Sequence, residues 1–273
     1  MDEDATNGPA NSVAAASTQA LRQLARCAAG RSGADVERIV REARRCARRE
    51  GRPLGWADID RALRAGREDM PQDVRWRISI HEAGHALVYL ALGRGRISLI
   101  SIEAVHGGVV HVEAEPHALE TEDWMMAGIT GRLAGRAAEE LVFGDPVAGC
   151  GGPPESDLGV ATELAVMLEA SLGFGRHQPL LHRPMSDKAH LLALDQRLAA
   201  RVNARLEECY DRAKAILTNG RDAHLWLAKT AMRHGVLEGA DLKAVLDEAR
   251  QRLSDRSDTD ADTDVGQSDP DVV

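Results

Sequence analysis

The segment 81–85 reads His-Glu-Ala-Gly-His and carries the side chains best suited to chemistry. In a helix, His81 and His85 lie one turn apart on the same face, so both imidazoles can bind one metal ion. Glu82 lies on the adjoining edge, where it can take a proton from an ion-bound water more easily than it can bind the ion. Because zinc lowers the pKa of such a water to about 7, the pattern indicates hydrolysis assisted by Zn²⁺.

A catalytic zinc site of this kind needs a third protein ligand. The long form of the motif, which ends in a third histidine, is not present because Val88 and Ala91 occupy the positions that would carry glycine and histidine. This argues against a metzincin. Spacing alone leaves the downstream carboxylates of Glu139, Glu140 and Asp157 as candidates. The alternative interpretation of the motif is a pair of surface histidines on an amphipathic helix.

The elements that must position these residues are mostly helical. Helical periodicity runs through most of the chain and aromatic residues make up only 3%, so the sequence predicts a mainly α fold with a small β-element. The motif lies in a helix expected from about residue 73 to 92, which Gly93 ends. Strands are expected at 97–105 and 107–115, a helix capped by Thr121 at 121–143, a Gly- and Pro-rich loop at 145–155, and helices at 156–172, 191–219, 222–234 and 239–252.

A smaller helical unit is expected before this region. Ser32 and Asp35 form a capping-box-like start, Gly51 and Pro53 end the helix that follows, and a shorter helix begins near Trp56. A helix at about 21–28 completes this unit. The predicted organisation is a disordered leader (1–17), a small helical unit (18–67), a larger domain (71–252) and a disordered acidic tail (253–273).

Several blocks occur in a fixed order along the larger domain: His-Glu-Ala-Gly-His-Ala-Leu-Val at 81–88, Gly-Arg-Ala-Ala-Glu-Glu-Leu-Val-Phe-Gly at 135–144, Ser-Asp-Leu-Gly-Val-Ala-Thr at 156–162, Leu-Gly-Phe-Gly at 172–175 and Tyr-Asp-Arg-Ala-Lys-Ala-Ile-Leu at 210–217. From Ile80 to about Leu246 the chain resembles the peptidase domain of the FtsH-type ATP-dependent zinc metalloproteases. The resemblance implies that His81, His85 and Asp157 bind Zn²⁺ and that Glu82 is the catalytic base. One of the paired acids Glu139 and Glu140 could orient a ligand histidine.

The resemblance also implies an edge strand beside the zinc helix that pairs with extended substrates, at the Gly-Gly-Val-Val segment 107–110, and a hexameric ring. The first unit, with Ser-Gly-Ala-Asp-Val at 32–36 and Trp-Ala-Asp-Ile-Asp-Arg-Ala-Leu at 56–63, resembles the small helical lid of an AAA ATPase. This sequence contains no Gly-x-x-x-x-Gly-Lys-Ser/Thr loop, and its first lysine is Lys188. We therefore expect a peptidase without its own ATPase core and without the membrane anchor of the family.

Composition and charge narrow the functional classes. The 273 residues carry a net charge of −9, although the segment 21–67 is basic (13 Arg, 6 acids). An acidic protein with one basic segment lacks the dominant basic face of a nucleic-acid binder, so this class is disfavoured. The four cysteines contain no Cys-x-x-Cys pair, which favours a reducing compartment. The acidic N-terminus is unlike a secretory signal, and the apolar run 86–92 is far shorter than the roughly 20 residues of a membrane span. The expected location is the cytoplasm.

The function expected from the sequence is a zinc metalloendopeptidase that cuts unfolded or flexible proteins and peptides, alone or with an AAA ATPase acting in trans. The alternatives are a catalytically idle interaction or regulatory module with the same fold, and a fragment of a longer ATP-dependent protease. The remaining histidines, such as His106, His111, His117 and His224, are expected not to be ligands.

Overall fold

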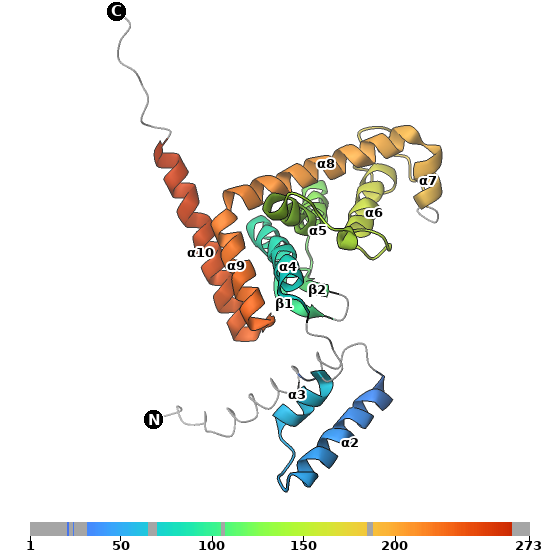
Figure 1. Cartoon of the computed structure of the whole chain (residues 1–273). Helices are drawn as coiled ribbons and strands as arrows, with labels where there is room; N and C mark the ends of the chain where they lie inside the picture. The colour runs from blue at the N-terminus through green and yellow to red at the C-terminus, as the bar shows by residue number, and fades with distance from the viewer. Residues whose placement is uncertain are drawn as a thin grey trace, which may run out of the picture. The chain divides into compact units, whose positions relative to one another are not determined.

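The computed structural model describes Leu21, Leu24 and residues 32–64, 70–104, 107–184 and 188–263. The chain divides into two compact units, one that contains α2 and α3 and one that contains α4 to α10 and the sheet (Figure 1). Most of the helix expected at 21–28, the leader at 1–17 and the last ten residues of the tail lie outside the described residues.

The first unit is a pair of helices, α2 (Gly33–Arg49) and α3 (Trp56–Arg64). The predicted capping box is present: the Asp35 N–H donates to Ser32 Oγ, and the Ser32 N–H donates to the Asp35 carboxylate. Gly51 then takes a positive φ of 68°, where glycine is favoured, and lets the chain turn. Ile39 of α2 and Leu63 of α3 form a small buried hydrophobic cluster.

The second unit is built from helices and one small sheet. Its elements are α4 (Gln72–Leu92), β1 (Arg96–Ala104), β2 (Gly107–Glu113), α5 (Glu122–Phe143), the short 3₁₀ helix η1 (Ala148–Cys150), α6 (Asp157–Ala170), α7 (Lys188–Leu194), α8 (Gln196–Asn219), α9 (Arg221–His234), β3 (Val236–Glu238) and α10 (Gly239–Thr263). The mainly α fold with a small β-element is therefore confirmed.

Helix α4, which carries the His-Glu-x-x-His segment, lies at the centre of this unit. It packs between α5 and α9 and also contacts α8, α10 and β2 (Figure 1). Gly93, with a left-handed φ of 61°, ends it as predicted. Because α4 is covered on several sides, its residues from Ser79 to Tyr89 are buried, apart from the partly exposed His81. The imidazoles are thus held inside the domain and not on an amphipathic surface.

The sheet has the order β2-β1-β3, which leaves β2 as an edge strand among the described strands. Strand β1 pairs antiparallel with β3, with Ile100 opposite Leu237. Both residues are fully buried against the α4 core. The other side of β1 is taken by β2, which contacts α4. The edge strand is thereby placed beside the motif helix.

Three features of the second unit differ from expectation. Asp195 caps a new helix by accepting from the Leu198 N–H at 2.9 Å, so the single helix expected at 191–219 is divided into α7 and α8. Strand β3 has only three residues, too few to give a period in the sequence. Helix α10 continues past Arg252 to Thr263, so the first part of the segment predicted to be a disordered tail is helical. No glycine or proline interrupts it before Gly266.

An ion cluster built on the largely buried side chains of Arg205 and Glu169 joins the middle of α8 to the start of α5 and the end of α6. The Arg205 guanidinium on α8 donates to Glu169 on α6 at 2.6 Å, to Glu122 at the start of α5 at 2.7 Å, and to the Phe174 carbonyl at 2.9 Å. Glu169 also accepts from Arg201 at 2.9 Å. This cluster fixes the far end of α6, whose first residue is Asp157.

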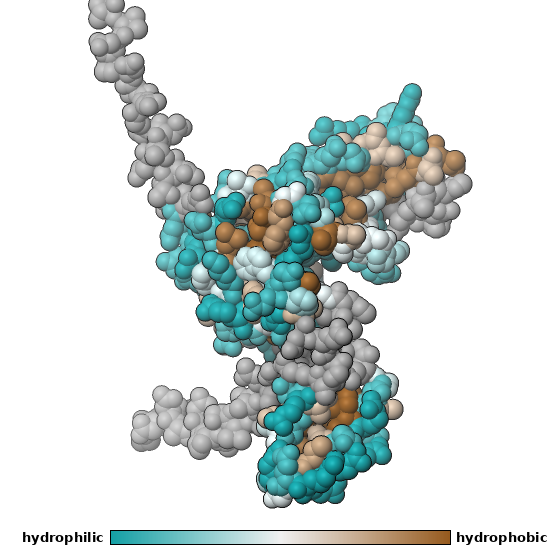
Figure 2. Space-filling view, viewed as in Figure 1, coloured by the Kyte–Doolittle hydropathy of each residue, from teal (hydrophilic) through white to brown (hydrophobic). Residues whose placement is uncertain are grey.

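Figure 2 shows apolar residues gathered along the part of the second unit that holds α6 to α8. Leu180, Leu181 and Leu194 are exposed there. No helix in the described part of the chain has both the length and the apolar character needed to cross a bilayer.

Candidate metal centre

His81 and His85 face each other one turn apart on α4, as the motif predicts. Their Nε2 atoms are 3.0 Å apart, and the two rings meet edge to face with centroids 4.7 Å apart. Both side chains are largely covered, with 14% of His81 and 7% of His85 exposed. Two ring nitrogens therefore point at one small, sheltered volume.

Asp157 brings the third donor from the start of α6. Its Oδ2 lies 3.4 Å from His81 Nε2 and 3.2 Å from His85 Nε2. Ser156 caps α6 by accepting from the Gly159 N–H, so Asp157 occupies the first helical position, where the helix dipole favours a negative charge. The structure thus brings together the three residues that the resemblance suggested, and Asp157 is the only one of the three candidate carboxylates in the cluster.

Hydrogen bonds to the far side of each ring fix which nitrogen carries the proton. His85 Nδ1 lies 2.7 Å from the Gly131 carbonyl oxygen, which can only accept, so Nδ1 is the protonated nitrogen. His81 Nδ1 lies 2.7 Å from Glu139 Oε1. Burial alone would raise the pKa of Glu139, but its bonds to His81 and the Val147 N–H outweigh burial and hold the pKa low, so this carboxylate also accepts. In the neutral rings both Nε2 atoms present lone pairs.

When both rings are neutral, three electron-pair donors converge with no proton between them, an arrangement that a cation stabilises. In the absence of a metal, burial disfavours a charge on His81, yet the bonds to Asp157 and Glu139 prevail and raise the pKa of His81 to about 10. The same bonds from both histidines hold the pKa of Asp157 far below its usual range despite burial. The cluster therefore attracts positive charge, as a proton or as a metal ion.

The spacing of the three atoms fits zinc. Donors about 2.0–2.1 Å from a zinc ion at the corners of a tetrahedron are about 3.3–3.4 Å apart. The observed separations of 3.0, 3.2 and 3.4 Å lie close to that value. Two imidazoles and one carboxylate are also a ligand set of catalytic zinc sites, which keep the fourth position open.

Small residues let α5 approach α4 closely at the cluster. A Cβ atom added to Gly135 would stand 2.3 Å from His81 Nε2 and 2.5 Å from His85 Nε2. A Cβ added to Gly84 would stand 2.6 Å from Ala138 Cβ and 2.9 Å from the Ala134 carbonyl oxygen. Any side chain at Gly135 would therefore displace the imidazoles.

Glu82 lies outside the three-donor cluster, against the edge strand. A Cβ atom added to Gly108 of β2 would stand 2.3 Å from Glu82 Cγ and 2.4 Å from its Oε1. Burial raises the pKa of Glu82, although the nearby His85 and His81 oppose the shift. A buried carboxylate with a raised pKa is a stronger proton acceptor, which suits the role predicted for this residue.

Glu139 ties the first histidine to the loop that leads to Asp157. Its Oε2 accepts from Arg77 at 3.0 Å and from the Val147 N–H at 3.0 Å. Further along, the Cys150 thiol donates to the Val147 carbonyl at 3.2 Å. Of the two paired acids, only Glu139 touches a ligand histidine. Glu140 points to α8, where it accepts from the Tyr210 hydroxyl at 2.6 Å.

Three contacts at the site were missed by the sequence reasoning: Gly131, Arg132 and Gly135. The Gly131 contribution is a backbone carbonyl, which no side-chain pattern reveals. Arg132, whose Nη1 lies 3.4 Å from Asp157 Oδ1, belongs to none of the motifs used in the sequence analysis. Gly135 stands inside the recognised block 135–144, so that block was the available signal for it.

The other histidines described are not part of the cluster, as expected. His224 is buried and lies 2.9 Å, through Nε2, from the Ile80 carbonyl, so it joins α9 to α4. His111 Nδ1 is 3.0 Å from Ser98 Oγ on the exposed side of the sheet. His106 lies outside the described residues.

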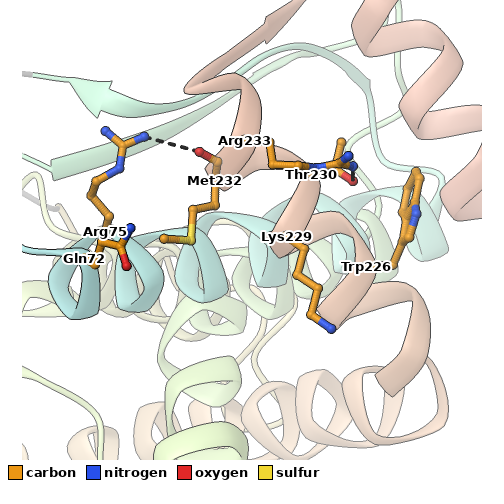
Figure 3. A pocket seen from close by; sticks show the side chains of 7 residues that line it. All are labelled: Gln72, Arg75, Trp226, Lys229, Thr230, Met232 and Arg233. Carbon is orange, nitrogen blue, oxygen red and sulfur yellow. Dashed lines mark hydrogen bonds between the residues drawn. The ribbon is translucent and has the colours of Figure 1, made fainter.

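A separate cavity of about 620 Å³ lies between α4 and α9 (Figure 3). Three of its side chains are cationic and none is acidic, and the Arg75 guanidinium donates to the Met232 carbonyl across it. None of the metal-cluster residues lines this cavity. Its lining consists of Gln72, Arg75, Trp226, Lys229, Thr230, Met232 and Arg233.

A buried helix with His-Glu-x-x-His and a convergent third carboxylate define a class, the metallopeptidases of the His-Glu-x-x-His type. Comparison with known protein families supports the assignment to this class. Residues 69–245 match Peptidase family M41, and because this stretch is more than half of the chain, the chain belongs to that family.

The relatives that this comparison found have names that agree with this family. The chain is 33% identical over 261 residues to "ATP-dependent zinc metalloprotease FtsH 1" of Sorangium cellulosum, covering 86% of this chain and 41% of the relative. It is 28% identical to a Thermotoga maritima protein (85% and 42% covered) and 26% identical to a Bacillus subtilis protein (90% and 42% covered), each named "ATP-dependent zinc metalloprotease FtsH". The resemblance to the FtsH-type peptidase domain is therefore confirmed. The chain spans about 40% of the length of these relatives.

Proposed function

We propose that this chain is a zinc endopeptidase that hydrolyses peptide bonds in unfolded or flexible proteins. The observation that carries the proposal is the convergence of His81 Nε2, His85 Nε2 and Asp157 Oδ2 at spacings of 3.0–3.4 Å. These three residues would hold Zn²⁺. When bound, the ion supplies Lewis acidity, which lowers the pKa of a coordinated water and polarises the scissile carbonyl.

Glu82 would act as the general base and then as the general acid. Its carboxylate takes a proton from the attacking water while the water oxygen bonds to the carbonyl carbon. The same carboxyl group then gives that proton to the amide nitrogen as the carbon–nitrogen bond breaks. Burial, which makes Glu82 a stronger base, supports this assignment.

The edge strand β2 would bind the substrate. Extended peptides can add to an exposed strand edge through backbone hydrogen bonds, and such pairing tolerates many side-chain sequences. Gly108 of β2 lies directly against Glu82, so a chain paired with β2 would run past the proposed base. This arrangement supports a preference for unfolded substrates.

We further propose that the peptidase works in an oligomer, together with ATPase activity supplied by a longer form of the protein or by a partner in trans. The exposed Leu180, Leu181 and Leu194 on the α6–α8 side support contact with a second copy of the chain. Light scattering on the purified protein would give the mass of the assembly. A Leu180→Glu variant should shift it toward the single chain, and an unchanged mass would argue against this surface.

The test of the peptidase proposal is hydrolysis of a fluorescent casein together with zinc content on the same preparation. We expect about one zinc per chain, activity that chelation removes and zinc restores, and loss of activity in Glu82→Gln with zinc retained. Glu207→Gln, at an exposed position on α8, is the matched control and should remain fully active. Metal-free, folded and inactive wild-type protein would favour the idle module, and undiminished cleavage by Glu82→Gln would remove the mechanism.

A further inference from the structure

Helix α5 contributes no metal donor, yet it contacts each of the three. Glu139 Oε1 lies 2.7 Å from His81 Nδ1, and the Gly131 carbonyl oxygen lies 2.7 Å from His85 Nδ1. The third contact is Arg132 Nη1, 3.4 Å from Asp157 Oδ1. In every case α5 binds the ligand side chain through the atom that does not face the other two donors.

The two oxygens of the Asp157 carboxylate have different partners. Oδ2 faces the two imidazoles at 3.4 and 3.2 Å, and Oδ1 faces the guanidinium. A carboxylate without such a partner can rotate about its Cβ–Cγ bond until both oxygens meet a bound cation. Arg132 opposes this rotation because its positive charge attracts Oδ1 away from the cation.

The number of bound oxygens matters for the chemistry. A catalytic zinc site keeps its fourth position open for water or substrate, and a second aspartate oxygen would occupy that position. We propose that Arg132 is a positioning residue that keeps Asp157 a one-oxygen ligand and so keeps the fourth position free. This inference rests on the metal site of the proposed function.

The environment of Arg132 supports this role. Its side chain is 45% exposed and Asp157 is 22% exposed, so the pair lies at the mouth of the site and not in the core. Among the described residues, Asp157 is its one carboxylate partner. The other cations of this part of α5 and α4 have different partners: Arg136 bonds the Cys150 thiol and Arg77 bonds Glu139.

Cobalt(II) added to the metal-free full chain is the probe, because four-coordinate Co²⁺ absorbs visible light several-fold more strongly than five-coordinate Co²⁺. We expect an intense spectrum from the wild-type chain, a several-fold weaker spectrum from Arg132→Met at the same metal content, and an intermediate one from Arg132→Lys. Hydrolysis by Arg132→Met with zinc bound should fall about tenfold, in kcat more than in KM. Arg212→Met, which removes an exposed arginine from α8, should match the wild-type spectrum.

The outcomes separate this inference from the proposed function. A wild-type chain that binds Co²⁺ with an intense spectrum, and an Arg132→Met variant with the same spectrum, would overturn the role of Arg132 alone. A wild-type chain that binds no Co²⁺ would overturn both. If Arg132→Met does not fold, Arg132→Lys decides: a weakened spectrum supports the role, because lysine keeps the charge but not the reach and geometry of the guanidinium, and a fully intense spectrum contradicts it.

Discussion

Replacing Gly135 by alanine adds only one methyl group but should abolish tight zinc binding. The added Cβ would stand 2.3 Å from His81 Nε2 and 2.5 Å from His85 Nε2, well below the 3.4 Å at which ordinary contacts begin. Relief of both contacts requires the imidazoles to move by about 1 Å, several times the roughly 0.2 Å tolerance of metal–ligand distances.

The size of the effect follows from this displacement. Loss of a residue that merely orients a ligand costs about 10–100-fold in metal affinity, so direct displacement of two ligands should cost at least about 100-fold. A 100-fold loss is about 2.8 kcal/mol of binding free energy. Because alanine favours a helix over glycine by about 1 kcal/mol, helix propensity works against unfolding of the metal-free variant.

The assay is competition for zinc against a chromophoric chelator, with the rise in melting temperature on adding zinc as a second readout. Gly149→Ala is the control: the nearest atom to its added Cβ is Val147 Cγ2 at 3.8 Å, so zinc affinity should not change. A Gly135→Ala variant that binds zinc as tightly as the parent would refute the placement of α5 against the imidazoles.

Three further changes give distinct results. Gly108→Ala should keep zinc but lose most hydrolysis, because its Cβ would displace Glu82; full activity on casein would contradict the proximity of β2 and the base. Arg205→Met should lower the unfolding free energy in urea by about 3 kcal/mol, because it leaves Glu169 buried with one partner fewer; a loss below about 1 kcal/mol would be inconsistent with a buried cluster. Burial lowers the pKa of His224, so the unfolded chain binds a proton below about pH 6.5 that the folded chain does not, and stability falls with acid by up to about 1.4 kcal/mol per pH unit. His224→Gln should remove that part of the slope in urea titrations between pH 5 and 7, and an unchanged slope would exclude His224 as its source.

Features set by local sequence were predicted well. The capping box of Ser32 and Asp35, the Thr121 cap and the glycine that ends α4 act within one helical turn, so their residue types are enough to place them. The pairing of His81 with His85 follows from the helical period alone.

Features set by tertiary approach were not accessible in the same way. Asp157 could not be selected by spacing, because its position depends on the path of residues 145–156, which Glu139 and Ser156 fix by hydrogen bonds. Gly108 and Gly135 act through the absence of a side chain next to another element, and a sequence does not show which element that is. The Arg132 contact depends on the same docking of α6 on α5.

The most direct test of the account is a crystal structure of the zinc-loaded chain with anomalous scattering recorded at the zinc edge. We predict one strong peak about 2.0–2.2 Å from His81 Nε2, His85 Nε2 and one oxygen of Asp157. A peak held by other residues, or no peak at these three in protein that hydrolyses casein, would contradict it.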